Sequence, residues 1–275
     1  MIKIVFFRSD QYGAKVLEKL QKASNIEVIK IIKEKNELKS LKNSLPQPDI
    51  GIVASFGALI PPEVLNWPRM GLLNLHPSLL PKYRGPTPVP TAILNGEKET
   101  GLTIIKVDEQ IDHGPIISQF KEEIRTDDTS EALLKRLFTM GAEVLITILP
   151  AFLEGKIELR EQDHSQANYT QKLTRDSGKM DWSKPAEYQE RFIRAMYPWP
   201  GAWTEIKLEH RTKNIEQRVN IKRLKILRAH LTSSAKPYPP TPKPSLVLDL
   251  VQLEGKNPVT WKQFLEGYPQ AKLLS

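Results

Sequence analysis

The sequence predicts an α/β protein of two domains, a doubly wound domain followed by a smaller β-rich domain. Over the first half of the chain, short and fully apolar runs alternate with amphipathic stretches. This pattern is typical of a parallel sheet that is covered by helices on both faces. With 275 residues, 40% of them hydrophobic, the chain has enough length and apolar surface for two cores.

The first half alternates strands and helices in the order that a doubly wound sheet requires. The expected strands are Lys3–Phe7, Glu27–Ile32, Asp49–Ala54 and Leu72–Leu75, and the expected helices are Ala14–Ala23 and Val89–Leu94. Residues 33–46 are polar and Lys-rich, and we expect them to be weakly helical. In such folds, ligands bind outside the carboxyl ends of the strands.

Two further strands, Thr103–Val107 and Pro115–Ile124, flank the loop Asp108–Gly114, and the strongest helix follows at Thr129–Leu153. Its apolar residues recur every three or four positions, so we interpret it as a packing helix that ends at Gly155. No 18 consecutive residues are apolar, so we expect no membrane span. The absence of cysteine and of a signal-peptide pattern favours a cytoplasmic protein.

The last third of the chain is different in composition. We predict a first domain at 1–160, a linker and connecting helix at 161–200, and a β-rich domain at 201–275. The β-rich domain is predicted from three stretches in which apolar and polar residues alternate, Ala202–Lys207, Val219–Leu231 and Leu246–Leu253.

Nearly all of the net charge of +8 lies in this last third. Residues 180–275 hold 16 Lys and Arg against 9 Asp and Glu, and residues 206–236 hold nine basic residues against two acidic ones. Such a patch attracts polyanions such as nucleic acids. An ordinary solvated basic surface is the alternative.

The strongest candidate for chemistry is the stretch Gly71–Gly85, GLLNLHPSLLPKYRG. Because successive strand residues point to opposite faces, Asn74 and His76 share one face at the end of a strand. An amide can donate to an oxygen that becomes negative, and an imidazole can carry a proton. A histidine at a strand end is more often structural, so the pair alone leaves both roles open.

The wider context of this pair resembles the folate-dependent formyltransferases, and among them the members that act on methionyl-tRNA. The matching runs are NLHPSLLPKYRG, GLTIIKVDEQIDHGPII, DWSKPAE, YPWPGAW and VQLEGKNPVTWKQFLEGY, in this order and over most of the chain. They include Asn74, His76, Gly85 and Asp112. The resemblance implies a Rossmann-like catalytic domain at 1–160 and a small β-barrel, OB-like, tRNA-binding domain at 201–275.

The resemblance implies transfer of a formyl group from the co-substrate 10-formyltetrahydrofolate to the amino group of methionine on initiator methionyl-tRNA. In this reaction the Asn74 amide would hold an oxyanion, and His76 would add a hydrogen bond or move a proton. Asp112 would hold His76 and a water molecule and help to accept the amine proton. From the residues alone the three are only chemically suitable, and an isolated Asp112 is more often a turn residue. We expect a monomer, and the spacing of the other histidines implies no metal.

The resemblance further implies a folate pocket between the loops Ser55–Pro61 and Asp108–Asp112. The candidate folate-binding residues are Ser55, Phe56, Gly57, Ile60, Pro61, Ser78, Leu79, Leu80, Pro81, Asp108 and Ile111. For Leu79, Leu80 and Ile60, a plain core position is the alternative. Lys82, Tyr83 and Arg84 are candidates for contacts with the folate tail or the substrate. The candidate tRNA-binding residues are Arg211, Lys222, Arg223 and Lys225.

Two departures from the family concern substrate binding. Arg8 stands where members usually carry glycine, and residues 33–46 are shorter than the glycine-containing basic loop thought to engage the tRNA acceptor end. Two other functions therefore stay open. One is formylation of an amino-sugar nucleotide, which does not require the basic last third. The other is nucleic-acid binding by a protein with a vestigial site, against which the intact trio argues.

Overall fold

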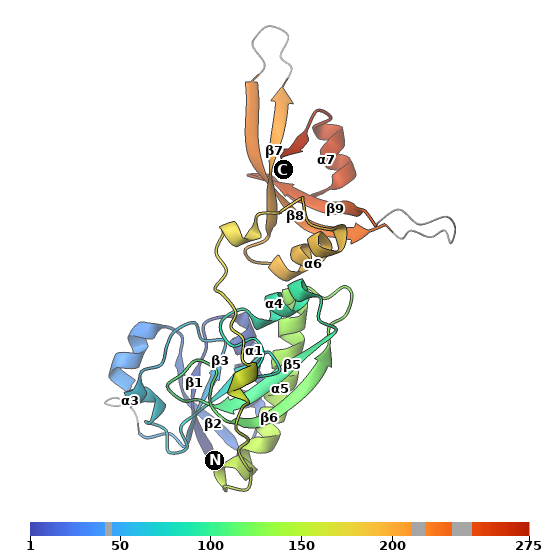
Figure 1. The fold of residues 1–275 in the computed structure, drawn as a ribbon. Coiled ribbons are helices and arrows are strands. Elements are labelled where there is room, and N and C mark those ends of the chain that lie inside the picture. The colour runs from blue at the N-terminus through green and yellow to red at the C-terminus, as the bar shows by residue number, and fades with distance from the viewer. Residues whose placement is uncertain (42–45, 211–217, 233–243, 275) are drawn as a thin grey trace. The chain divides into compact units, whose positions relative to one another are not determined.

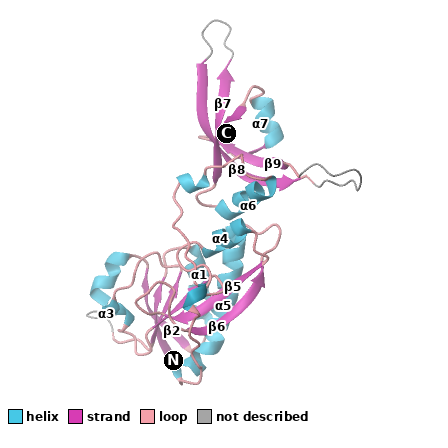
Figure 2. Ribbon diagram, viewed as in Figure 1, coloured by secondary structure: helices cyan, strands magenta, loops and turns pink. Residues whose placement is uncertain are grey.

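The computed structural model of the chain describes residues 1–41, 46–210, 218–232 and 244–274 (Figure 1). These residues form two units whose segments interleave along the sequence. Unit 1 consists of Met1–Ala92, Glu97–Thr126 and Ala132–Lys172. Unit 2 consists of Ile93–Gly96, Asp127–Glu131 and Leu173–Ser275. Helices and strands alternate in unit 1, whereas strands predominate in unit 2 (Figure 2).

Unit 1 contains a six-stranded sheet in the order β2-β1-β3-β4-β5-β6. Strands β1 to β4 pair in parallel, but β5 is antiparallel to both β4 and β6. The predicted α/β sheet is therefore confirmed, with two antiparallel pairings at one side, both made by β5. The strands are β1 Ile2–Phe7, β2 Ile26–Ile32, β3 Ile50–Ala54, β4 Leu72–His76, β5 Glu99–Lys106 and β6 Ile116–Glu123.

The helix α1 (Gln11–Lys22) and the helix α5 (Ser130–Leu153), which belongs to unit 1 from Ala132 on, lie side by side. The rings of Tyr12 and Phe138 stack with centroids 6.3 Å apart. α5 also packs closely on β5, because a Cβ added at Gly141 would lie 2.7 Å from the Leu102 side chain. Within the described residues, α5 alone is long and apolar enough to span a membrane, and 39% of its most apolar 18 residues are buried in the protein. The core helix of a globular protein can have the same length and composition, and the contact with β5 agrees with the predicted packing role.

Both faces of the unit 1 sheet are covered, as a doubly wound fold requires. On one face, Val5 and Phe7 belong to a core cluster with Leu38 of η1 (Lys35–Ser40) and Val64 of α3 (Pro62–Leu65). Side chains that point to the opposite face, such as Ile4 and Phe6, are equally buried. A further helix, α4, spans Pro88–Asn95.

Residues 161–172 belong to unit 1 and not to a linker, which corrects the predicted boundary. The backbone of Arg84 exchanges two hydrogen bonds with this segment, from Arg84 N to Asn168 O at 2.9 Å and from Thr170 N to Arg84 O at 2.7 Å. Short turns at His164–Gln166 (η2) and Asp176–Gly178 (η3) complete the polar stretch. Backbone and side-chain hydrogen bonds hold it, so its sequence shows no apolar period.

Unit 2 contains a five-stranded antiparallel sheet in the order β10-β9-β8-β7-β11. Its elements are α6 Ala186–Met196, β7 Ala202–His210, β8 Arg218–Leu231, β9 Leu246–Leu253, β10 Val259–Thr260, α7 Trp261–Gly267 and β11 Lys272–Leu274. The sequence pattern missed the last three. The β-rich second domain is confirmed, but within the described residues no pairing joins the edge strands β10 and β11. Closure into a barrel stays a prediction.

Candidate active site

The three predicted catalytic side chains meet at the carboxyl end of β4. The Asp112 carboxylate accepts a hydrogen bond from Asn74 Nδ2 at 3.2 Å, and its other oxygen lies 3.4 Å from His76 Nδ1. His76 is 4% exposed, so its ring is enclosed by the protein. The strand gives Asn74 and His76 a common face, and the loop between β5 and β6 supplies Asp112.

The loop is shaped to bring Asp112 to this position. Asp112 has a φ of +50°, in the left-handed region that Asp adopts more readily than most residues. Two residues later, a Cβ on Gly114 would lie 1.9 Å from Lys106 O, so only glycine fits. Gly85 N donates to Asp112 Oδ2 at 2.8 Å, and Gln162 Nε2 donates to the carbonyl oxygens of Asp112 and Gly114. Side chain and backbone of Asp112 are both fixed.

Sequence reasoning missed several groups that hold the trio. His76 Nε2 lies 2.9 Å from the Tyr83 carbonyl oxygen, and the Tyr83 N–H donates to Asn168 Oδ1. Gly85 is the last residue of the motif NLHPSLLPKYRG, so the motif marked this position but not its hydrogen bond to Asp112. Gln162 and Asn168 stand in the polar segment predicted as a linker, where no motif or period marked them.

The first predicted folate loop follows β3. Ser55 has a φ of +54°, and its hydroxyl donates to Asp10 Oδ2 at 2.5 Å. Phe56 and Ile60 pack against the core cluster of unit 1, so the alternative of a core position holds in part for Ile60. Gly57 and Leu59 are exposed, Leu59 by 73%. Pro61 directly precedes α3. The loop is anchored by two apolar side chains and is open between them.

In the turn after β4, two of the candidate folate-binding residues, Ser78 and Leu80, have buried side chains. Ser78 is fully buried, and its hydroxyl donates to Lys82 O at 2.7 Å. Leu80 lies in a small core cluster with Ile105 and Ile116. Both side chains are buried, so the alternative of a core position fits Leu80, and the candidacy of Ser78 for folate binding stays a prediction that its side chain does not support. Pro81, next in the chain, is half-buried.

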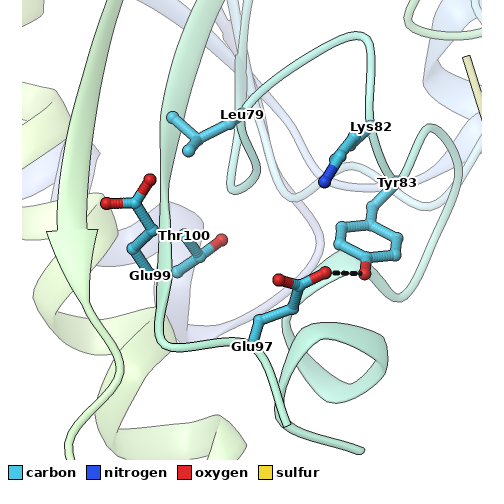
Figure 3. A pocket seen from close by; sticks show the side chains of 6 residues that line it. All are labelled: Leu79, Lys82, Tyr83, Glu97, Glu99 and Thr100. Carbon is cyan, nitrogen blue, oxygen red and sulfur yellow. Dashed lines mark hydrogen bonds between the residues drawn. The ribbon is translucent and has the colours of Figure 1, made fainter. Parts of the chain in front are cut away.

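Leu79 lines a cavity of about 80 Å³ together with Lys82, Tyr83, Glu97, Glu99 and Thr100 (Figure 3). The trio does not line this cavity.

The second predicted folate loop carries Asp108 and Ile111. The Asp108 carboxylate accepts from Gln110 N at 2.9 Å and pairs with His113 Nδ1 at 2.7 Å. Ile111 is 51% exposed. The ring of His113 stacks on that of His164, with centroids 3.9 Å apart. Within the described residues, no group of three or more His, Cys, Asp or Glu side chains is arranged to hold a metal ion.

Arg84 is a structural residue, which corrects its candidacy for contacts with the folate tail or the substrate. It is 2% exposed, and its guanidinium contacts Gln162 Oε1 at 2.8 Å and His164 Nδ1 at 2.8 Å. Arg8, which stands where family members usually carry glycine, is half-buried and donates to Asp10 O at 3.2 Å.

The basic residues of β8 do not share one face of the unit 2 sheet. In the antiparallel pair of β7 and β8, Lys222 lies opposite Ile206, which is buried. Arg223 and Lys225 lie opposite Glu205 and Trp203, on the other face. The three predicted tRNA-binding residues are therefore split between the two faces. The fourth, Arg211, lies outside the described residues.

We call the face that carries Arg223 and Lys225 the outer face. The Arg223 guanidinium lies 3.9 Å from the centroid of the Trp203 ring, and Lys179 Nζ lies 5.7 Å from it. Lys207 is two residues beyond Glu205 on β7, and Lys272 of β11 lies opposite Lys207. The outer face thus gathers the cations Lys179, Lys207, Arg223, Lys225 and Lys272 around one tryptophan and Glu205.

An amide donor, an imidazole and a carboxylate that meet at the end of a strand in a doubly wound sheet are chemically suited to group transfer with acid–base assistance. Comparison with protein families narrows this class. The family described as "Formyl transferase" matches residues 33–149, and "Formyl transferase, C-terminal domain" matches residues 172–242. The chain belongs to the formyl transferase family.

Similar curated proteins agree with this assignment. Methionyl-tRNA formyltransferase of Chloroflexus aggregans is 48% identical over 158 residues, which cover 58% of this chain and 51% of that protein. The Bartonella henselae protein of the same name is 38% identical over 185 residues, 67% of this chain and 57% of that protein. The match spans about half the length of these relatives. The predicted resemblance is confirmed.

Solved structures show the same fold. Methionyl-tRNA formyltransferase from Clostridium thermocellum has a TM-score of 0.66 at 20% identity, covering 92% of this chain and 99% of that one. HypX from Aquifex aeolicus in complex with tetrahydrofolic acid has a TM-score of 0.72 at 17% identity, covering 97% of this chain and 47% of that one. The sugar 3N-formyl transferase WlaRD has a TM-score of 0.65 at 20% identity, covering 94% and 99%.

Proposed function

We propose that this protein transfers a formyl group from 10-formyltetrahydrofolate to the amino group of methionine on initiator methionyl-tRNA, for translation initiation. The observation that carries the proposal is the Asp112 carboxylate, which joins Asn74 and His76 at 3.2 and 3.4 Å. Relatives named methionyl-tRNA formyltransferase, at 38–48% identity, support it. In this proposal unit 1 is catalytic, unit 2 binds the tRNA, and the protein acts as a cytoplasmic monomer.

The three side chains have complementary roles. Asn74 uses one N–H on Asp112, and its second N–H is available for an oxygen that becomes negative during transfer. The attacking amine must lose a proton, and His76 Nδ1 with the Asp112 carboxylate forms a place where that proton is held. Gly85 N keeps the carboxylate oriented throughout.

The folate supplies the formyl carbon. The loops Ser55–Pro61 and Asp108–Asp112 would hold it, because each combines backbone polar groups with an exposed apolar side chain, Leu59 in one and Ile111 in the other. An aromatic ring edged with amide groups needs this combination. Leu79 and Pro81 remain candidates for its apolar wall.

The outer face of unit 2 is suited to the tRNA. Its five cations can neutralise phosphates, and the Trp203 ring stacks under the Arg223 guanidinium and orients it. Lys222, on the opposite face, would contribute less.

The test is an assay of the purified protein with 10-formyltetrahydrofolate and two acceptors in parallel, methionyl-tRNA and an amino-sugar nucleotide. We expect formyl-methionyl-tRNA only, and a fall of at least about a hundredfold in kcat for Asn74→Ala, as for other oxyanion donors. The matched control is Asn66→Ala, because Asn66 is exposed and its amide donates to Pro62 O at 3.2 Å within its own turn. Formylation of the sugar nucleotide, or of neither acceptor, contradicts the proposal.

A further inference from the structure

The His76 ring is held from both sides, and the two sides differ in chemistry. Nε2 lies 2.9 Å from the Tyr83 carbonyl oxygen, and Nδ1 lies 3.4 Å from Asp112 Oδ2. Both flanking oxygens are acceptors, but the Nε2 contact has the length of a full hydrogen bond and the Nδ1 contact is longer, so the geometry favours a proton on Nε2 in the neutral ring. The lone pair of Nδ1 is then on the side of Asp112.

The carbonyl that selects this tautomer belongs to a residue in an unusual conformation. Tyr83 has a φ of +61°, in the left-handed region, which is strained for a residue with an aromatic side chain. Such a conformation persists only where the surroundings determine it. Tyr83 is 9% exposed, and its N–H is bound by Asn168 Oδ1.

The side chain of Tyr83 has a polar anchor of its own. Its hydroxyl donates to Glu97 Oε1 at 2.6 Å, at the wall of the small cavity that Leu79 and Thr100 also line (Figure 3). An O–H donor to a carboxylate at this distance is a charge-assisted hydrogen bond, stronger than one between neutral groups. Glu97 lies two residues before β5, so the contact ties the turn after β4 to the neighbouring strand of the sheet.

We propose that Tyr83 and Glu97 are positioning residues for His76. The hydroxyl–carboxylate bond fixes the Tyr83 backbone, the Tyr83 carbonyl holds the proton on Nε2, and Nδ1 stays directed at Asp112. This role in catalysis rests on the proposed formyl transfer. The orientation of the His76 ring is independent of the proposed formyl transfer, and it can be measured without any substrate.

The primary experiment is long-range ¹⁵N–¹H NMR of the histidine rings at alkaline pH, where the neutral ring is observed. The His76 signals are assigned by their disappearance in His76→Asn. We expect the Nε2–H tautomer in the parent, a mixture of tautomers in Tyr83→Phe and in Glu97→Ala, and the parental tautomer in Glu97→Gln, whose amide oxygen still accepts. Glu99→Ala is the matched control, because Glu99 lines the same cavity but pairs with Lys121.

The second measurement is formylation kinetics of the same variants. Removal of a hydrogen bond that orients a functional histidine lowers activity about 10–100-fold at metal sites, and we expect about tenfold here. The reduction should fall on kcat, with KM and thermal unfolding nearly unchanged.

An Nδ1–H tautomer in the parent overturns the proposal, as does a parental tautomer in both Tyr83→Phe and Glu97→Ala, or an equal effect of Glu99→Ala. A parent protein that shows the expected tautomers but formylates no methionyl-tRNA refutes the proposed function and leaves the positioning of His76 standing.

Discussion

Around Asp112 in unit 1, the polar side chains are enclosed and held by several hydrogen bonds, whereas on the outer face of unit 2 the charged side chains extend toward solvent. Asp112 is contacted by Asn74, His76 and Gly85, and its backbone by Gln162. On the outer face, Lys225 is exposed, and Arg223 rests on an aromatic ring.

The difference indicates two ways of handling charge. A network of enclosed groups depends on each member, because removal of one leaves its partners unsatisfied in a medium of low dielectric constant. Exposed cations act together through their summed field, which salt screens. Single substitutions should therefore have large effects in unit 1 and graded, salt-dependent effects in unit 2.

The largest expected effect is that of Asp112→Asn. Asn accepts the same left-handed backbone and keeps one acceptor oxygen, but it lacks the charge and cannot take up a proton. We expect kcat to fall at least about a hundredfold, within the range for general acid–base groups. The temperature of unfolding should also fall, because the amide NH2 of the variant faces either the Asn74 amide or Gly85 N, which both donate to Asp112 in the parent. Asp163→Asn is the control, since that exposed carboxylate bonds Ser165 and Gln166. Parental turnover in Asp112→Asn would remove the carboxylate from the mechanism.

Arg84→Lys probes the same network at a residue that we place outside the chemistry. Lysine cannot reproduce the planar fork that contacts Gln162, His164 and the Tyr169 hydroxyl. We expect the free energy of unfolding to fall by about 1.5–3 kcal/mol, typical for hydrogen bonds to a charged group. Hydrogen exchange in residues 162–170 should rise. The exposed Arg160, which contacts Gln119 at 3.3 Å, gives the control Arg160→Lys, and equal reductions in both variants would contradict a special role for Arg84.

The sequence predicted the sheet of unit 1 and the proximity of Asn74, His76 and Asp112, because apolar runs and a motif mark them; their catalytic roles stay a prediction. Apolar runs mark β1, β3 and β4, and the motif around Asn74 and His76 includes its own turn. It did not predict that residues 161–172 join unit 1, because Gln162 and Asn168 act through individual hydrogen bonds that leave no periodic pattern.

Charge counts likewise revealed a basic region but not its geometry. The face on which a strand residue lies depends on register, and Lys222 and Lys225 differ by an odd number of positions, so they lie on opposite faces. In unit 2, β10, α7 and β11 escaped prediction because two of them are only two or three residues long, and α7 is a short helix of seven residues.

The outer face can be tested with a matched pair on one strand. Lys225→Glu reverses a charge on the outer face, and Lys222→Glu reverses the same charge on the other side. We expect Lys225→Glu to weaken methionyl-tRNA binding more, and to flatten the slope of log affinity against log salt by about 1 for each phosphate that is no longer neutralised. Binding titrations at several salt concentrations measure both quantities. Equal slopes for the parent and both variants would mean that these cations only solvate the sheet.

The smallest expected effect concerns Glu37. Its carboxylate is half-buried and accepts backbone hydrogen bonds, so it is less enclosed than Asp112 and more constrained than the cations of the outer face. The N–H groups of Lys33 and Glu34 donate to Glu37 Oε1 at 2.8 and 3.0 Å. The hydrogen bond from Lys33, ahead of that from Glu34, holds the pKa of Glu37 below its usual value of 4.5. A carboxyl group whose pKa is lowered by folding stabilises the protein above its unfolded pKa, and this contribution disappears as the pH falls through the folded pKa. Glu37→Gln should thus lower the free energy of unfolding at neutral pH by about 0.5 kcal/mol, the low end for a capping side chain. The difference should disappear as the pH falls through the lowered pKa of Glu37. Urea unfolding of parent and variant over a series of pH values, from neutral to acid, measures it. A difference that persists unchanged in acid would show that the charge of the Glu37 carboxylate does not contribute to stability.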